Sequence, residues 1–367
     1  MVDPRLTRLA DLLVNYSVQV QPGEWTLVQA EVVAMPLARE VYRAVLRAGG
    51  HPLTLLFDEA ISEIQYQEAS DEQLVWVSPV ERLLIEEADV MIALRATNNT
   101  RAMSNVDPAK MAKAQAARTE LSAIHMRRAA AGELKWTLTQ YPTQASAQEA
   151  EMSLSEYEDF VFGATFVDRE DPIAEWQRIS ALQQRMVDWL KGKRHVTVKS
   201  ANCDLSLSIE GRTFINSDGR RNMPSGEIFT GPVEDAVNGW VRFTYPAIYR
   251  GRAVEGVELR FEDGKVVEAR AEKNEEFLLS QLDIDAGARY LGEFAIGTNF
   301  GITKFTGNIL FDEKIGGTIH MALGRSYPET GGENESAIHW DMICDMRQGG
   351  EIYVDGELFY KDGEFVV

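Results

Sequence analysis

The sequence predicts an N-terminal parallel α/β domain followed by a C-terminal, mainly antiparallel, barrel-like β domain. Three observations carry this prediction. The first half alternates segments of helical period with short apolar segments, the second half alternates residue by residue, and a short basic segment (residues 191–195) separates them. A chain of 367 residues is long enough for two domains. We place their boundary between residues 1–194 and 195–367.

The first half consists of strand and helix patterns that follow one another. The helix over residues 37–48 is amphipathic and ends at Gly49 and Gly50, which is a common helix stop. Strands that alternate with helices are typical of a parallel sheet covered on both faces. The predicted strands are residues 25–29, 51–57 and 89–94, and the predicted helices are residues 4–16, 37–48, 79–88 and 153–190.

The loop after the first predicted strand reads AEVVAMP over residues 30–36 and contains no glycine. A dinucleotide-binding loop needs glycines so that the pyrophosphate can approach the backbone. We therefore expect the α/β fold without a nucleotide site.

The second half has the period of a half-buried strand. Asp263-Gly264 and Asp355-Gly356 each indicate the turn of a hairpin. One helix over residues 274–286 interrupts the strands, with Asn274 as its expected N-cap. The predicted strands are residues 196–199, 205–209, 257–261, 266–271, 351–354 and 357–360.

The composition excludes several partners. The net charge is −20 and the pI is near 4.8, so nucleic acid and an anionic membrane would repel the protein. No apolar segment approaches the roughly 18 residues of a membrane span, and early charges such as Asp3 and Arg5 leave no signal-peptide stretch. Two cysteines, Cys203 and Cys344, are too few for a disulfide framework. We expect a cytoplasmic protein.

Residues 336–344, SAIHWDMIC, alternate in character. In a strand, His339 and Asp341 lie on one face, whereas Trp340 and Met342 lie on the other. A histidine and an aspartate on one face can both reach a single metal ion. A strand with one solvated polar face explains the same pattern, so the pair alone does not decide between the two.

Further candidate ligands accompany this pair, and each also has an ordinary explanation. His320 lies in the glycine-rich segment GGTIHMALGRSYPETGG, and Tyr327 follows seven residues later. Such glycines let a loop approach a ligand, or they simply make tight turns. Glu227 in MPSGEIFTGP and Glu293 in YLGEFAIG lie in mainly apolar or glycine-bearing surroundings, and each can equally be a solvated turn residue.

The order of these motifs is more specific than any one of them. It runs NMPSGEIF (residues 222–229), Gly292-Glu293, Ile319-His320 with Gly324 and Tyr327, and GGENESAIHWD (residues 331–341). In order and approximate spacing, this pattern resembles the M29 family of metallo-aminopeptidases (the aminopeptidase T, aminopeptidase S and PepS type). The resemblance is strongest from about residue 215 to the end of the chain.

The resemblance implies two divalent metal ions per chain in the C-terminal domain. The residues that match the family's dinuclear metal-site positions are Glu227, Glu293, His320, Tyr327, His339 and Asp341. By this resemblance, Glu293 and Asp341 would bridge the ions, Glu227 would complete the shell of one ion, and His320 and His339 would serve the other. Tyr327 would be a ligand or a catalytic partner. Carboxylate and imidazole ligands suit zinc, cobalt or manganese. The resemblance also implies a homodimer.

The implied function is a metal-dependent aminopeptidase that releases N-terminal amino acids from peptides with a free N-terminus, through a hydroxide activated by two metal ions. Two alternatives stay open. One is a related metal-dependent amidase with a narrow non-peptide substrate, and the other is a metal-bound scaffold protein without turnover. The presence of all six matched positions argues against the scaffold. The chain contains neither HExxH nor GxSxG, which excludes those two hydrolase motifs.

Overall fold

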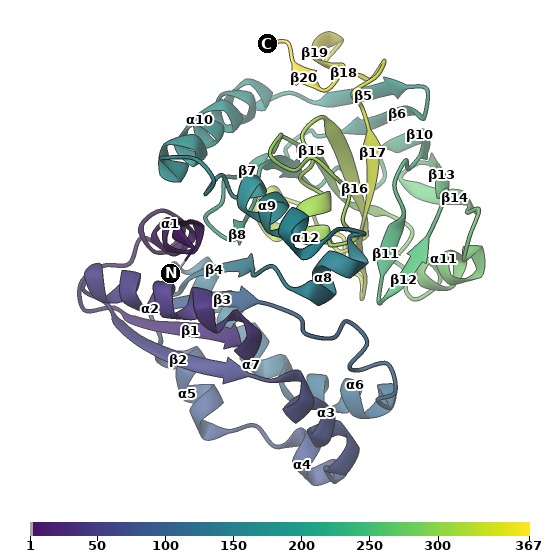
Figure 1. Ribbon diagram of the computed structural model, residues 1–367. Coiled ribbons are helices and arrows are strands. Elements are labelled where there is room, and N and C mark those ends of the chain that lie inside the picture. The colour runs from purple at the N-terminus through teal and green to yellow at the C-terminus, as the bar shows by residue number, and fades with distance from the viewer. Residues whose placement is uncertain (1–2) are drawn as a thin grey trace. The chain divides into compact units, whose positions relative to one another are not determined.

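The computed structural model describes residues 3–367 and divides them into two compact units (Figure 1). The first unit contains the described residues up to Ile173 together with Gly219–Met223. The second contains Ala174–Asp218 and Pro224–Val367. The sequence alone places the boundary at residue 194, whereas the compact units divide near the start of a long helix, α10 (Pro172–Leu190).

The first unit is built on a five-stranded parallel sheet in the order β2-β1-β3-β4-β8. This confirms the predicted parallel α/β fold. The apolar run of β1 is buried, and Leu27 and Val28 have no exposed surface. The strands are β1 (Trp25–Glu31), β2 (His51–Phe57), β3 (Val90–Arg95), β4 (Lys135–Gln140) and β8 (Asn222–Met223).

The helices of this unit begin at residues that suit a helix start. Three of them have an N-cap side chain that accepts a hydrogen bond from a backbone N–H group in the first turn, and proline follows that residue. These N-caps are Asp3 of α1, Ser78 of α5 and Asp107 of α6. The helices are α1 (Pro4–Leu12), the π-helix η1 (Leu13–Ser17), the 3-10 helix η2 (Val32–Ala34), α2 (Met35–Arg47), α3 (Glu59–Glu68), α4 (Asp71–Val75), α5 (Pro79–Glu87), α6 (Pro108–Ala117), α7 (Thr119–Ala130), α8 (Gln144–Glu149) and α9 (Leu154–Ala164).

The second unit contains antiparallel strands, as predicted, but in residues 3–367 they do not close into a barrel. They form an eight-stranded sheet (β14-β13-β10-β6-β5-β18-β19-β20), a five-stranded sheet (β17-β16-β15-β9-β7) and a two-stranded ribbon (β11-β12). One continuous apolar core joins the two large sheets, with Leu205 and Leu259 from the first and Phe294 and Met321 from the second. Side chains between stacked sheets therefore form the core that the alternating sequence predicts.

The six predicted strands of the second half correspond to β5, β6, β13, β14, β18 and β19, and the structure adds further strands that the sequence did not predict. The strands of this unit are β5 (His195–Ser200), β6 (Cys203–Ser208), β7 (Ile215–Ser217), β9 (Glu227–Thr230), β10 (Val237–Arg242), β11 (Ala247–Tyr249), β12 (Arg252–Val254), β13 (Glu258–Glu262), β14 (Lys265–Arg270), β15 (Leu291–Gly297), β16 (Thr318–Gly324), β17 (His339–Asp345), β18 (Glu351–Val354), β19 (Glu357–Lys361) and β20 (Glu364–Phe365). The hairpins at Asp263-Gly264 and Asp355-Gly356 are both present.

Two helical segments differ from the sequence prediction. The predicted helix over residues 153–190 is two helices, because the chain leaves the helical conformation after α9 and resumes it at Pro172. Asn274 precedes α11 (Glu275–Leu282) in a left-handed conformation, and its amide donates to the Ala253 carbonyl instead of capping the helix. The short elements are α12 (Ile309–Asp312) and η3 (Pro328–Thr330). Within residues 3–367, no helix is both long and apolar enough to cross a membrane.

Candidate metal centre

The two faces of strand β17 differ in chemistry. Trp340, Met342 and Cys344 belong to the apolar core between the sheets. His339 and Asp341 alternate with them and therefore lie on the other face of the five-stranded sheet. The alternation that the sequence predicted for this segment is confirmed.

Strands β15 and β16, which pair side by side in the same sheet (Figure 1), continue this polar face. Their neighbours Phe294 and Met321 enter the core, so Glu293 and His320 point away from it. The strand register sets Ala322 directly between Glu293 and Asp341. Small side chains thus alternate with the polar ones on this face.

A bulge at Gly292 sets the direction of the Glu293 side chain. The register shifts between Leu291 and Glu293, so Gly292 is an extra residue in β15. Both Leu291 and Phe294 can therefore enter the core although they are three residues apart. A Cβ atom at position 292 would lie 2.3 Å from the Gly324 carbonyl oxygen, which leaves room only for glycine.

Five of the six predicted ligands form two groups that share Glu293. Glu227, Glu293 and His320 make the first group, and Glu293, His339 and Asp341 make the second. His320 Nε2 lies 3.4 Å from Glu293 Oε1, whereas His339 Nε2 lies 3.3 Å from Glu293 Oε2. The two oxygens of one carboxylate therefore face two different histidines.

These separations suit atoms that share a metal ion. Two ligand atoms about 2.1 Å from one ion, at a tetrahedral angle, lie about 3.4 Å apart. His320 Nε2 is 3.5 Å from Glu227 Oε2, and His339 Nε2 is 3.5 Å from Asp341 Oδ1. Glu227 Oε2 is also buried without a hydrogen-bond partner. The oxygen and nitrogen donors thus fit divalent metal ions.

The electrostatics of the cluster favour positive charge. Burial alone would lower the pKa of His320, but Glu293 and Glu227 outweigh it and raise the pKa to about 9. Burial opposes the charged form of His339 too, yet Asp341 and Glu293 raise its pKa to about 12. Burial acts to raise the pKa of Asp341, but His339 lowers it to about 2. The carboxylates therefore favour a cation in their midst.

The backbone orients His339. Its Nδ1 lies 2.7 Å from the Arg325 carbonyl oxygen, which can only accept, so Nδ1 carries the hydrogen. In the neutral ring, Nε2 would then face Glu293 and Asp341 with its lone pair available to a metal ion. Fixing one ring nitrogen in this way is typical of metal-binding histidines.

A buried glutamine supports Glu227. Gln183, on α10, donates to the Glu227 carbonyl at 2.6 Å and to the Ser217 carbonyl at 3.0 Å. Its own side-chain oxygen accepts from the Thr298 hydroxyl. The start of β9 is therefore held by hydrogen bonds that do not use the Glu227 carboxylate.

Tyr327 lies beside the cluster, just before η3. Its ring contacts the rings of His339 and Phe229 edge-on, with centroids 5.1 Å and 5.5 Å away. Tyr327 is 39% exposed overall, but partial burial raises the pKa of its hydroxyl, and the charges of Glu293 and Asp341 add to this rise. The phenol therefore remains a hydrogen-bond donor at neutral pH.

The sequence analysis missed two residues that follow α12. Glu313 offers a carboxylate oxygen to a third group with His320 and Asp341. Lys314 is fully buried, contacts Glu313 directly, and its Nζ lies 3.8 Å from Glu227 Oε1. Burial raises the pKa of Glu313 to about 7 although Lys314 lowers it. A Glu-Lys pair before two glycines resembles an ordinary surface turn, so sequence offered no signal for their burial.

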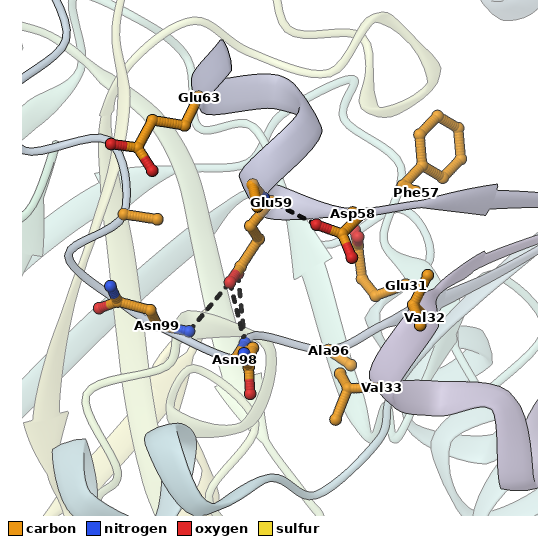
Figure 2. Close-up of a pocket in the computed structure, with 12 residues that line it drawn as sticks. Glu31, Val32, Val33, Phe57, Asp58, Glu59, Glu63, Ala96, Asn98 and Asn99 are labelled. Atoms are coloured by element: carbon orange, nitrogen blue, oxygen red, sulfur yellow. Dashed lines mark hydrogen bonds between the residues drawn. The ribbon is translucent and has the colours of Figure 1, made fainter.

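A separate acidic pocket lies in the first unit. It has a volume of about 310 Å³ and is lined from the ends of β1, β2 and β3, where the strand order reverses. In a doubly wound sheet, ligands often bind at this edge. Figure 2 shows Glu59 turned toward Asn98 and Asn99. The Glu59 carboxylate accepts hydrogen bonds from the backbone N–H groups of both residues. Burial raises the pKa of nearby Glu31, and so do Glu59 and Asp58. This lining would repel a phosphate.

Comparison with known proteins identifies relatives along the whole chain. Aminopeptidase 2 of Geobacillus stearothermophilus is 30% identical over an alignment that covers 99% of this chain and 95% of that protein. Aminopeptidase T of Thermus thermophilus is 27% identical, with 98% and 95% covered. The structure of wild-type AmpT from Thermus thermophilus superposes with a TM-score of 0.87 at 25% identity and covers 99% of each chain.

A more distant structure shares the fold alone. The 2,5-dihydroxypyridine dioxygenase of Pseudomonas putida KT2440 has a TM-score of 0.57 at 14% identity, with 100% of this chain and 99% of that one covered.

The family model described as thermophilic metalloprotease (M29) matches residues 2–365. This chain therefore belongs to the thermophilic metalloprotease (M29) family.

Proposed function

We propose that this protein is a metal-dependent aminopeptidase that releases N-terminal amino acids from peptides. The observation that carries the proposal is the pair of ligand groups joined by Glu293, with donor atoms 3.3–3.5 Å apart. The names of the relatives, aminopeptidase 2 and aminopeptidase T, support the choice of substrate. The dioxygenase that shares the fold indicates that the site, and not the fold, must decide the chemistry.

The ligand geometry supports two ions with Glu293 as the bridge. Glu227 and His320 would complete one shell, and His339 and Asp341 the other. The resemblance assigns both histidines to one ion, whereas these distances favour one histidine per ion. Asp341 also lies near His320, which supports its proposed second role as a bridge. Zinc, cobalt or manganese suits these oxygen and nitrogen donors. The nearby Cys344 belongs to the apolar core, so its thiol would not be a ligand.

Two bound divalent ions supply a polarised carbonyl and an activated water at neutral pH. The protein's own groups orient the reactants around them. Tyr327 keeps its proton and would donate a hydrogen bond to the oxygen of the substrate carbonyl as negative charge develops there. His339 is held in one tautomer by the Arg325 carbonyl, so that its Nε2 would serve as a metal ligand.

We also propose a cytoplasmic homodimer. The dimer follows from the family resemblance, and exposed apolar side chains in the first unit support it. Ile61 and Trp76, on α3 and just after α4, are 68% and 62% exposed, and Val80 on α5 is 62% exposed. Large apolar side chains with this exposure would gain from burial against a partner.

The central test measures metal content and turnover together. We expect two divalent ions per chain, and hydrolysis of aminoacyl-p-nitroanilides that stops after chelation and returns with added metal. Glu227→Ala should lose one ion and most of the activity. Full activity after exhaustive chelation would disprove a metal enzyme. Equal hydrolysis of N-acetylated and free substrates would disprove an aminopeptidase and favour a general amidase.

A further inference from the structure

The two proposed ion positions have matching donors. Each would take one carboxylate and one imidazole of its own, and both would share Glu293. Glu227 and His320 belong to the first position, and Asp341 and His339 belong to the second. The donors alone therefore predict similar affinities for two ions of one kind. Any difference in affinity must come from the groups that contact these ligands.

The two imidazoles differ in what their other nitrogen contacts. His339 Nδ1 lies 2.7 Å from the Arg325 carbonyl oxygen. His320 Nδ1 is buried, and within residues 3–367 it has no hydrogen-bond partner. A hydrogen-bond acceptor at one ring nitrogen orients the ring and makes the other nitrogen a better ligand. His339 has this support and His320 lacks it, so the position of His320 should hold its ion less firmly.

The two carboxylates differ as well. Glu227 Oε2 is 3.5 Å from His320 Nε2, whereas Glu227 Oε1 is 3.8 Å from Nζ of Lys314. In the described part of the chain, no lysine or arginine lies as close to Asp341 as Lys314 lies to Glu227. A cation of the protein therefore contacts a ligand of one position and not of the other.

Glu313 does not offset this difference. It contacts Lys314, and one of its oxygens lies within 4.8 Å of ligand atoms of both His320 and Asp341. Because those two ligands belong to different positions, the negative charge of Glu313 acts on both ions. The positive charge of Lys314 acts most strongly at Glu227, where it competes with an ion for the same carboxylate.

Lys314 is held at this place. Its side chain has no exposed surface, and a buried ammonium group needs carboxylate partners because it has lost its hydration. The backbone fixes its distance from Glu227. The Thr298 N–H donates to the Gly226 carbonyl, and the next N–H group, of Asn299, donates to the Lys314 carbonyl. Glu227 Oε1 therefore stays with Lys314, which leaves Oε2 as the oxygen for an ion.

We propose that the two ion positions have unequal affinities, and that the position of Glu227 and His320 is the weaker one because Lys314 occupies one oxygen of its carboxylate. The proposal rests on the proposed two-metal function. The position of His339 and Asp341 would fill first, and the second ion would bind and leave at higher metal concentrations. Protein prepared without added metal would then hold one ion and need a second for full activity.

The test is a titration of the metal-free wild-type chain with zinc, in competition with a chelator. We expect two binding steps whose Kd values differ about 100-fold. In Lys314→Met, the weaker step should tighten about tenfold or more because the repulsion is lost, and the stronger step should change less than about threefold. Lys314→Arg keeps the charge and should keep both steps. Lys304→Met, at an exposed lysine, is the control for a change of net charge alone.

Glu227→Gln assigns the two steps to the two positions. It should remove the weaker step and leave the stronger step within about threefold of the wild type. This variant and the wild-type titration decide the matter if Lys314→Met fails to fold. Equal affinities in the wild type, loss of the stronger step in Glu227→Gln, or an unchanged weaker step in folded Lys314→Met would overturn the proposal. A wild-type chain that binds fewer than two ions would instead overturn the proposed two-metal function.

Discussion

Each unit of this protein gathers four carboxylates, but the two clusters differ in what faces them. In the first unit, Asp58 caps α3 through the Ala60 N–H, and Glu59 accepts the N–H groups of Asn98 and Asn99 (Figure 2). In the second unit, Glu293 is only 5% exposed and faces imidazole nitrogens. Backbone N–H groups donate to two carboxylates of the first cluster, Asp58 and Glu59, whereas three carboxylates of the second cluster face imidazole nitrogens.

This contrast shows that acidic residues alone do not define a metal site. A carboxylate satisfied by backbone N–H groups has little to gain from an ion. A buried carboxylate oxygen without a donor, such as Glu227 Oε2, gains a great deal. Imidazole neighbours and unpaired buried oxygens are therefore the features that distinguish the second cluster.

The sharpest way to break the comparison is Glu293→Gln. Each Glu293 oxygen faces a different histidine, so the amide should weaken both proposed ion positions at once. We expect at most one ion per chain by elemental analysis, and a loss of kcat/KM of about 1,000-fold or more. Glu59→Gln is the matched change in the first unit and should leave both quantities unchanged. Two tightly bound ions in Glu293→Gln would contradict the bridge.

A smaller effect is expected from Ala322→Val. Ala322 lies between Glu293 and Asp341 in the strand register, on the face where the ions would lie. Valine suits a strand but would crowd that space, and overpacking costs about 1–3 kcal/mol. We expect metal affinity about tenfold to a hundredfold lower, measured by competition with a chelator, together with a lower Tm because Ala322 is fully buried.

Ala269→Val in β14, a strand of the eight-stranded sheet, is the control for Ala322→Val. It should leave the metal affinity as in the wild type. If both variants bind metal equally well, the ions do not lie over Ala322.

The smallest effect should come from Glu59→Gln itself. The Glu59 carboxylate accepts hydrogen bonds from the backbone nitrogens of Asn98 and Asn99, 3.1 Å and 2.9 Å from its Oε2 atom. Both hydrogen bonds are exposed to solvent. We expect a loss of about 1 kcal/mol or less in the free energy of unfolding. Hydrogen exchange should be faster at Asn98 and Asn99, and unchanged in β1. A change in metal content would show that the acidic pocket also holds an ion.

The fold was predictable because its periodicities are strong. The strand over residues 51–57 matches β2, and the hairpins followed from Asp-Gly pairs at 263–264 and 355–356. The barrel prediction was wrong, because alternation fixes which face of a strand is apolar and not whether the sheet closes. Asn274 does not cap α11, since its side chain bonds instead to a residue distant in sequence.

The site was predictable only in part. Alternation placed His339 and Asp341 on one face, but the selection of Glu227 and Glu293 needed the resemblance to a family. Glu313 and Lys314 could not be found in this way, because their burial depends on how the chain turns between α12 and β16. The alternation of residues along a strand predicts which side chains share one face of the sheet. Tertiary packing then determines which charged residues from other segments lie against that face.

The bulge at Gly292 has a consequence for how this site can be lost. A strand without that residue would return to a regular ladder in which Leu291 still faces the core and Glu293 still faces away from it. Substitution is the more damaging change, because any side chain at position 292 would meet the carbonyl oxygens of Gly324 and Arg325. The proposed ion pair therefore depends on the absence of one side chain as well as on the donors that the strands carry.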